Sequence, residues 1–250
     1  LRTPITVMSG YSQMLLNDPK LERHEEYFPM ISGIISGIAR METIVSSILD
    51  MARIDSRVMQ LHPEPLILSI LFQAIRTTFD QVCQERNLTM TMKGLEGLPI
   101  IQADTEAMRK AFHHLLVNAV KYTPNGGIIT VAGHSVPPGD AEFPDGGVEI
   151  IVSDTGIGID PSAQQLIFTK FYQTSEVAIH SSSTTTFKGG GPGLGLAIAR
   201  GIVEAHEGKI WAESPGYDEV ACPGSHFHVI LPLTMHKLGY IDAPNKVIKG

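Results

Sequence analysis

The sequence predicts an α+β protein in which an N-terminal helical hairpin is followed by an α/β sandwich domain. Three observations carry this prediction: a heptad-spaced apolar seam near the N-terminus, mixed helices and strands after residue 61, and strands that follow one another closely. The strands are too numerous for the strict strand and helix alternation of a doubly wound sheet. With 250 residues, 43% of them hydrophobic, the chain can bury the cores of two modest domains.

The N-terminal hairpin is predicted from apolar residues spaced three and four apart. The clearer seam belongs to the second helix and consists of Ile31, Ile34, Ile38, Met41, Val45, Ile48 and Ala52. A shorter helix precedes it, and the Asn-Asp-Pro sequence at 17–19 separates the two. Because a hairpin cannot cover its own seam, we expect two copies to pair as a four-helix bundle. Packing of the hairpin on the rest of its own chain is the alternative.

The second domain is predicted to begin where Pro63 and Pro65 break the helical run. Helices are expected over 69–84, 105–122 and 195–206, and strands over 88–92, 99–102, 128–134, 148–153, 209–213 and 226–232. The neighbouring strands 128–134 and 148–153 are predicted to be antiparallel. The predicted domains are thus 1–60, 61–233 and a tail or linker, 234–250.

Charge and cysteine content limit the possible partners and compartment. The net charge is −7 and no run of like charges occurs, so neither a nucleic-acid partner nor direct membrane contact is expected. Cys83 and Cys222 match neither a disulfide framework nor a zinc site, which favours the cytoplasm. No uninterrupted apolar run of span length and no leader is seen. Since the chain starts at Leu1 without methionine, we expect it to be part of a longer protein that can be membrane-anchored upstream.

The helix predicted at 105–122 carries a polar face formed by His114, Asn118, Lys121 and Tyr122. The amide oxygen of Asn118 is a suitable hard ligand for Mg²⁺. Lys121 can offset phosphate charge, and Tyr122 can lie against a base. Taken alone, such a face is more often simply solvated.

The strand at 148–153 ends in a carboxylate, Asp154, followed by Gly156 and Gly158. An ionised carboxylate only accepts hydrogen bonds, which suits the exocyclic amine of adenine, and glycines let the backbone approach a flat ring closely. An ordinary Asp-Thr-Gly turn is the alternative. A Ca²⁺ loop is excluded because Gly156 stands where that loop needs an oxygen ligand.

A glycine-rich segment at 189–195 runs directly into the helix predicted from Gly195. Backbone N–H groups at a helix start can bind an anion such as a phosphate. Two familiar phosphate motifs are excluded: Gly208 and Lys209 are followed by Ile210, which does not complete a Walker A motif, and no G-x-G-x-x-G follows a strand. Any ATP is therefore bound by another scheme.

These segments, in this order, resemble the sensor histidine kinases of two-component systems. Residues 114–123 resemble the N box, 154–158 the first glycine box, 167–172 the F box and 193–196 the second glycine box. The opening Leu-Arg-Thr-Pro at 1–4 resembles the tail of the phosphoacceptor motif H-E-x-R-T-P. The resemblance covers the chain up to about residue 233 and implies a GHKL-type (Bergerat) ATP-binding domain.

The resemblance implies roles for individual residues. Asn118 would coordinate Mg²⁺, Asp154 would recognise the adenine of ATP, and Thr3 would position a water for dephosphorylating a response regulator, the partner protein. Phosphate charge would be met by Lys121, Lys170 or Lys188, since Gln173 replaces a frequent arginine. The remaining predicted nucleotide contacts are Tyr122, Gly156, Gly158, Gly191, Gly193, Leu194, Gly195 and Leu196. Residues 174–191 would form the ATP lid.

Besides Gln173, two further departures from the family pattern keep an alternative open. The acceptor histidine and its neighbouring glutamate are expected just before Leu1, and His24-Glu25 lacks the Arg-Thr-Pro that should follow such a pair. His114 stands where the N box usually has its first asparagine. A degenerate kinase that binds nucleotide and a regulator without phosphoryl transfer is therefore the alternative. Gyrase-type, mismatch-repair and heat-shock chaperone ATPases share the sandwich, but the hairpin argues against them.

Overall fold

The computed structural model describes residues 2–17, 27–56, 59–139, 142–172, 187 and 193–235, with the backbone alone for 2–4. The chain divides into two compact units, Leu1–Ala52 and Arg53–Gly250. The domain limits predicted from the sequence, at 60 and 233, stay a prediction.

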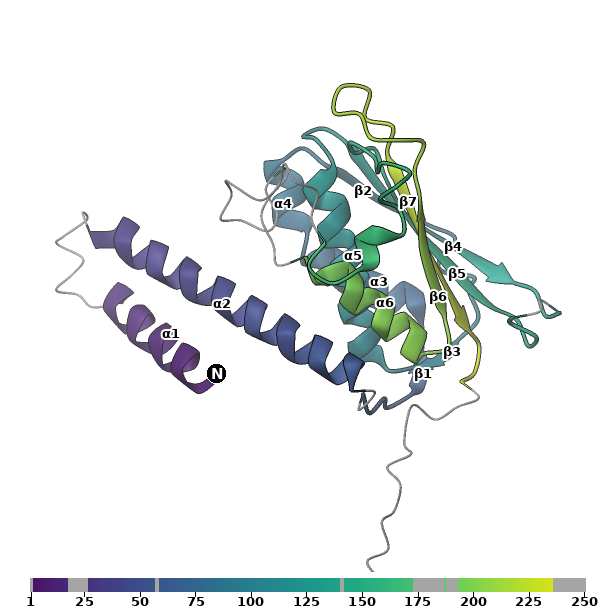
Figure 1. The fold of residues 1–250 in the computed structure, drawn as a ribbon, viewed down its shortest axis with the longest axis horizontal. Coiled ribbons are helices and arrows are strands. Elements are labelled where there is room, and N and C mark those ends of the chain that lie inside the picture. Colours follow the sequence, from purple (N-terminus) through teal and green to yellow (C-terminus); the bar gives the residue numbers. More distant parts are fainter. Residues whose placement is uncertain are drawn as a thin grey trace, which may run out of the picture. The chain divides into compact units, whose positions relative to one another are not determined.

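The first unit is an antiparallel helical hairpin of α1 (Arg2–Leu16) and α2 (Phe28–Asp55) (Figure 1). The predicted seam of α2 is only partly buried in the single chain. Ile31 and Ile38 are 8% and 4% exposed, whereas Ile34, Met41 and Ile48 are 53%, 46% and 48% exposed. Helix α1 also carries exposed apolar side chains, among them Tyr11 and Met14. A single copy therefore leaves an apolar stripe in water, which is unfavourable unless another surface covers it.

In the described part of the chain, α2 is the one helix that is long and apolar enough to cross a membrane. The expectation that this chain has no membrane span stays a prediction, because the core helix of a soluble bundle passes the same test of length and composition. It rested on an uninterrupted apolar run, and α2 instead places Ser, Gly and Thr between its apolar residues. This composition is also that of a bundle helix, and the heptad spacing of α2 is typical of a bundle.

The second unit is built on a five-stranded sheet with the order β2-β4-β5-β7-β6. Its strands are β2 (Thr89–Lys93), β4 (Ile128–Val136), β5 (Gly147–Asp154), β6 (Lys209–Glu213) and β7 (Ser225–Pro232). The predicted antiparallel pairing of β4 with β5 is confirmed, and β2 pairs with β4 in parallel. The strand order and the mixed pairing give an α+β sandwich rather than a doubly wound sheet.

A second, two-stranded sheet pairs β1 (Glu64–Leu66) with β3 (Ile101–Ala103). The sequence did not predict β1, because Pro63 and Pro65 indicate a break in structure. Proline is tolerated in a strand that has a partner on one side only, where a missing N–H leaves no ladder bond unmade. Pro65 lies in such a strand, opposite Gln102.

The helices of this unit are α3 (Leu68–Thr77), α4 (Asp80–Glu85), α5 (Thr105–Tyr122) and α6 (Gly195–Ala205), with a short 3₁₀ turn η2 (Leu166–Phe168). The predicted range of α5 is confirmed, but the single helix predicted over 69–84 is two helices. Thr78 ends the first one: its hydroxyl donates to the Ile75 carbonyl at 2.7 Å, and its backbone N–H also turns to Ile75. Such tightening of the last turn ends a helix without glycine or proline, which is why the pattern missed it.

Helices α3, α5 and α6 cover one face of the large sheet and leave the other face open (Figure 1). The core lies between them: along β5, Val148, Ile150 and Val152 are fully buried and alternate with outward residues. Successive strand residues point to opposite faces. Asp154, two residues after Val152, therefore belongs to the helix side of the sheet.

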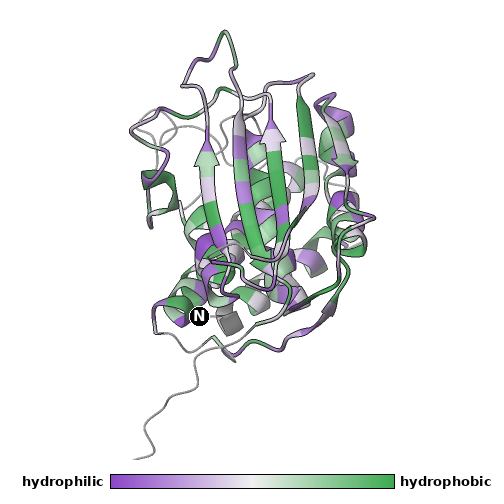
Figure 2. Ribbon diagram, turned by 90° about the vertical axis from the view of Figure 1, so that its right-hand side faces the viewer, coloured by the Kyte–Doolittle hydropathy of each residue, from purple (hydrophilic) through white to green (hydrophobic). Residues whose placement is uncertain are grey.

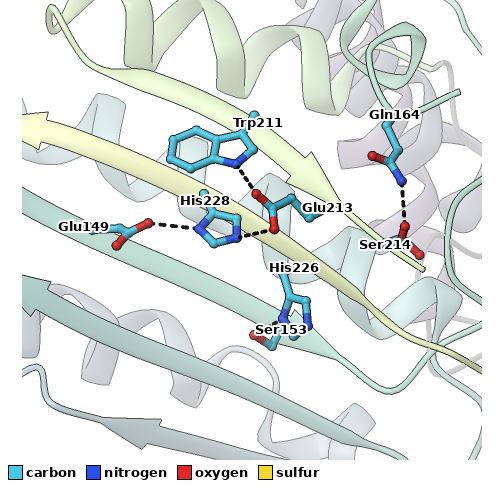
Figure 3. Close-up of polar contacts among 8 residues, drawn as sticks. All are labelled: Glu149, Ser153, Gln164, Trp211, Glu213, Ser214, His226 and His228. Atoms are coloured by element: carbon cyan, nitrogen blue, oxygen red, sulfur yellow. Dashed lines mark hydrogen bonds and ion pairs between the residues drawn. The ribbon is translucent and has the colours of Figure 1, made fainter. Parts of the chain in front are cut away.

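Figure 2 looks onto the open face of the sheet, over which the described residues of this second unit place no helix. Between β5, β6 and β7 this face carries a polar and aromatic cluster (Figure 3). The rings of Trp211 and His228 stack with centroids 4.7 Å apart, and His228 Nδ1 lies 2.9 Å from Glu149 Oε1. Trp211 Nε1 donates to Glu213 at 3.0 Å. Cross-strand pairs of this kind stabilise a sheet where no second layer covers it.

His206 joins the end of α6 to the start of α5. It is 1% exposed, with Nδ1 2.8 Å from the Ile202 carbonyl oxygen and Nε2 3.0 Å from the Asp104 backbone nitrogen. Because the carbonyl accepts and the N–H donates, both contacts are satisfied by the neutral ring protonated on Nδ1. Asp104 in turn caps α5, its Oδ1 accepting from the Ala107 N–H, while its Oδ2 accepts from the His62 N–H.

We expect acid to destabilise the second unit through His206. Burial lowers the pKa of His206, and burial together with Arg109 lowers the pKa of His113. The native state then binds fewer protons than the unfolded state, so the unfolding free energy should fall as the pH decreases below the unfolded histidine pKa of about 6.5. Urea unfolding measured between pH 8 and 5 checks this. His206→Gln should flatten the dependence; a slope equal to that of the parent chain would contradict the assignment.

Candidate functional site

The carboxylate of Asp154 is held rigidly at the end of β5. It is 5% exposed, its Oδ1 accepts from the Gly156 N–H at 2.8 Å, and its Oδ2 accepts from the Ser225 hydroxyl at 2.5 Å. Ser225 is the register partner of Asp154 on β7, and it too lies on the core side of the sheet. Burial raises the pKa of the Asp154 carboxyl, and the hydrogen bonds from Ser225 and Gly156 counteract that rise. The site therefore presents one fixed, buried acceptor group.

Gly156 brings the loop after β5 against the end of α5. A Cβ at this position would lie 2.4 Å from the carbonyl oxygen of Tyr122 and 2.6 Å from Asp154 Oδ1. The next residue, Ile157, donates its N–H to the same Tyr122 carbonyl at 3.1 Å. Any side chain larger than that of glycine would separate the helix from the loop. Asp154 and Tyr122, two predicted base contacts, are thereby brought together.

Gly158 makes a similar close approach on the other side of the loop. Its φ is +74°, and a Cβ would lie 2.0 Å from the Gly216 carbonyl oxygen. The β6–β7 connection is fixed here by Ser214, whose hydroxyl accepts from the Ile159 N–H and whose carbonyl accepts from Gln164 at 2.8 Å (Figure 3). Both the left-handed φ and the missing space require glycine.

Arg86 fixes the other side of the end of α5. Its nearly buried guanidinium donates to the carbonyl oxygens of Val120 at 2.6 Å and Thr123 at 2.5 Å, and to Asn125 Oδ1 at 2.9 Å. The last carbonyls of a helix have no partner within the helix, so an arginine fork is well suited to satisfy them. Arg86 thus positions the turn that carries Tyr122.

At the opposite end of the site, the start of α6 packs on α5 and on the F-box segment. Gly193, with φ +68°, accepts from the Phe171 N–H through its carbonyl at 2.9 Å. A Cβ on Gly195, the first residue of α6, would lie 3.1 Å from His114 Nδ1. Leu194 is 1% exposed and belongs to the core, while Leu196 is half-buried.

The predicted polar face of α5 lies between these two ends. His114, Asn118, Lys121 and Tyr122 are all half-buried rather than fully solvated. Lys121 Nζ lies 4.8 Å from the centroid of the Tyr122 ring. Burial lowers the pKa of Lys121 and raises that of the Tyr122 phenol. From His114 to Tyr122 the helix rises about 12 Å, at about 1.5 Å per residue.

Four predicted site residues are not brought into this arrangement by the described structure. Lys170 forms an ion pair with Asp55, the last residue of α2, so its predicted phosphate contact stays a prediction. The side chain of Thr3, and residues Lys188 and Gly191, lie outside what the structure describes. The same holds for the predicted lid 174–191, of which only position 187 is described.

Sequence reasoning missed Ser225 and Arg86. Ser225 could have been found from the period-two pattern of β7, because it shares the buried face with Phe227, Val229 and Leu231. A serine on a core face needs a partner, which the neighbouring strand supplies. Arg86 gave no such signal, since its acceptors lie 34 and more residues away.

Two family models match the chain. The model described as Histidine kinase-, DNA gyrase B-, and HSP90-like ATPase matches residues 103–235, more than half of the sequence. The model of the His Kinase A (phospho-acceptor) domain matches residues 1–57.

A curated relative and two solved structures place these matches in context. The adaptive-response sensory kinase SasA of Synechocystis is 30% identical over 241 residues, covering 93% of this chain and 56% of the relative. The structure of full-length ShkA in complex with AMPPNP is 23% identical, with a TM-score of 0.75, covering 94% of this chain and 44% of that one. ThkA in complex with the response regulator protein TrrA gives a TM-score of 0.62 at 23% identity, covering 94% and 59%. The chain thus spans little more than half of the SasA relative.

Proposed function

This chain belongs to the sensor histidine kinases of two-component systems, and from that premise we propose that it binds Mg²⁺-ATP and transfers the γ-phosphate of ATP to a histidine. The phosphoryl group would then pass to an aspartate of a response regulator. The observation that carries the proposal is the buried Asp154 carboxylate, fixed by Ser225 and Gly156 beside the end of α5.

The arrangement suits a nucleotide laid along α5. Asp154 would accept from the adenine amine, with Tyr122 beside the base and Gly156 and Gly158 allowing close approach of the backbone. The N–H groups at the start of α6, from Gly195 onward, would receive phosphate oxygens. These two ends are separated by the rise of α5 from Tyr122 to His114, a distance on the scale of an extended nucleotide.

The donors present also fit a magnesium ion between the phosphates and α5. Mg²⁺ prefers oxygen ligands and is usually held by one or two protein groups together with substrate phosphates and waters. Asn118 supplies an amide oxygen, and it is half-buried midway along the polar face. When bound, the ion would offset the negative charge of the phosphates. Lys121 and Lys188 would offset that charge further. Thr3 would position a water molecule for dephosphorylation of the response regulator.

Nucleotide binding is the first test of the proposal. Calorimetric titration with the ATP analogue AMPPNP in the presence of Mg²⁺ should show one site per chain. Absence of binding would overturn the proposed function. Incubation of a polypeptide extended by the His-Glu pair expected before Leu1 with radiolabelled ATP should then give acid-labile label on a histidine. Binding without label would favour the degenerate kinase.

We further propose that the hairpin pairs with a second copy and that the partner protein is a response regulator. The exposed half of the α2 seam supports the first part. The second part draws on the ThkA complex with its response regulator. We place this core in the cytoplasm, because such a kinase requires ATP; this location is compatible with a membrane-anchored parent protein.

We expect Ile34→Asp to convert a dimer into a monomer. Ile34 is 53% exposed in one chain, so a charge there leaves the hairpin intact and is costly only inside a bundle. Ile38, 4% exposed, is a poorer probe because a charge there also disrupts the hairpin itself. Multi-angle light scattering at micromolar concentration measures the outcome. Ser36→Asp, exposed on the other side of α2, should remain dimeric. A monomeric parent chain would end the bundle proposal.

A further inference from the structure

His114 and Asn118 stand one helical turn apart on α5. Residues four apart on a helix are neighbours, with about 5–6 Å between their Cβ atoms. Two donors at this spacing can bind the same ion, since helical pairs of metal-binding histidines use it. His114 supplies an imidazole nitrogen and Asn118 an amide oxygen.

The position of the His114 ring is set by α6. Its Nδ1 lies 3.1 Å from where a Cβ on Gly195 would be, and its Cγ 3.6 Å from that point. The ring thus lies against the first residue of the helix whose start is proposed to receive phosphate. The neighbouring His113 packs near Phe79, with ring centroids 5.2 Å apart, and its ring lies edge-on to that of His114 at 6.4 Å. The two adjacent histidines therefore have different surroundings.

We infer that His114 is a ligand of the nucleotide-bound metal and shifts the preference of this site from Mg²⁺ toward transition metals such as Mn²⁺ and Co²⁺. This inference rests on the proposed function, because nucleotide phosphates supply the remaining ligands. The described residues contain no group of three His, Cys, Asp or Glu side chains able to hold a metal without such help.

Donor chemistry gives the direction of the preference. Mg²⁺ favours oxygen ligands and gains little from an imidazole, whereas affinity for nitrogen donors rises from Mn²⁺ to Co²⁺. A site with two oxygen-donating side chains would bind Mg²⁺, Mn²⁺ and Co²⁺ with more similar affinities. The replacement of an oxygen donor by His114 should therefore appear as a metal-dependent nucleotide affinity.

The test is calorimetric titration of AMPPNP in Mg²⁺, Mn²⁺ or Co²⁺. We expect the parent chain to bind the analogue about tenfold more tightly with Co²⁺ than with Mg²⁺, with Mn²⁺ between them, following the order of nitrogen affinity. His114→Asn should reduce that ratio to about twofold, while Mg²⁺-dependent affinity is kept or improved. His113→Asn is the matched control and should retain the parent's ratio. The intrinsic preference of the analogue for each ion cancels in the comparison between variants.

A spectroscopic readout tests the ligand directly. Imidazole bound to Co²⁺ should give a strongly shifted, exchangeable N–H proton resonance in the AMPPNP complex. This resonance should be present in the parent and in His113→Asn, and absent in His114→Asn. Equal metal ratios in the parent and His114→Asn, with no such resonance, would overturn the inference and leave nucleotide binding intact. Failure of the parent to bind AMPPNP with any of the three ions would instead overturn the proposed function.

Discussion

Asp154→Asn should weaken AMPPNP binding by about ten- to a hundredfold, the equivalent of losing one hydrogen bond to a charged group, about 1.5–3 kcal/mol. The asparagine has the same shape and can still accept from the Gly156 N–H, and its amide can donate to the Ser225 hydroxyl. The fold should therefore survive. What changes is the acceptor offered to the adenine amine, because half of the carboxylate becomes a donor.

Asp160→Asn provides the matched control. Asp160 lies in the same loop, but its carboxylate is exposed and bonded to Ser162, so the same substitution there should leave affinity unchanged. Calorimetry with AMPPNP and with adenosine separates base recognition from phosphate binding. Both ligands should lose affinity in Asp154→Asn. Unchanged adenosine binding in that variant would remove Asp154 from the base-recognising role.

Arg86→Ala should lower the unfolding free energy by about 3–5 kcal/mol, because truncation leaves three acceptors near the end of α5 without the guanidinium. Such a loss is a large part of the stability of an ordinary domain. Arg86→Lys should recover only part of it, since an ammonium cannot reproduce the fork that reaches Val120, Thr123 and Asn125 together. Urea unfolding followed by circular dichroism measures both variants.

Arg109→Ala tests whether the position of the arginine matters. Arg109 pairs with Glu106 on the surface of α5, with half of its side chain exposed, and such pairs contribute about 0–1 kcal/mol. A similar loss of unfolding free energy in Arg109→Ala and Arg86→Ala would show that the buried contacts of Arg86 contribute no more to stability than a surface ion pair.

Elements in which the pattern of apolar residues indicates the buried face could be predicted from the sequence. The range of α5 follows from its apolar stripe between Asp104, which caps it, and Thr123. Strand β5 is a β-branched run that ends in Asp154, and its pairing with β4 follows from closeness in sequence. The base end of the candidate site was predictable for the same reason, as Asp154, Gly156 and Gly158 lie together in one segment.

Features that depend on distant partners could not be predicted. The parallel pairing of β2 with β4 joins residues separated by a whole helix. The link from His206 to Asp104 spans 102 positions. The break between α3 and α4 comes from hydroxyls of Thr77 and Thr78 that bond backwards to their own helix, a choice that a hydrophobic pattern does not encode.

Because Trp211 is the single tryptophan of the chain, intrinsic fluorescence reports on one place only, the outer face of the sheet between β6 and β7. The indole stacks on His228 there and bonds to Glu213, so its emission should change when these strands separate. Helices α3, α5 and α6 lie on the other face of the sheet (Figure 1), and the candidate nucleotide site is built along α5 and the start of α6. The tryptophan emission should therefore follow unfolding of the Arg86 variants closely. Nucleotide binding should change this emission very little, so a nucleotide titration requires a different probe.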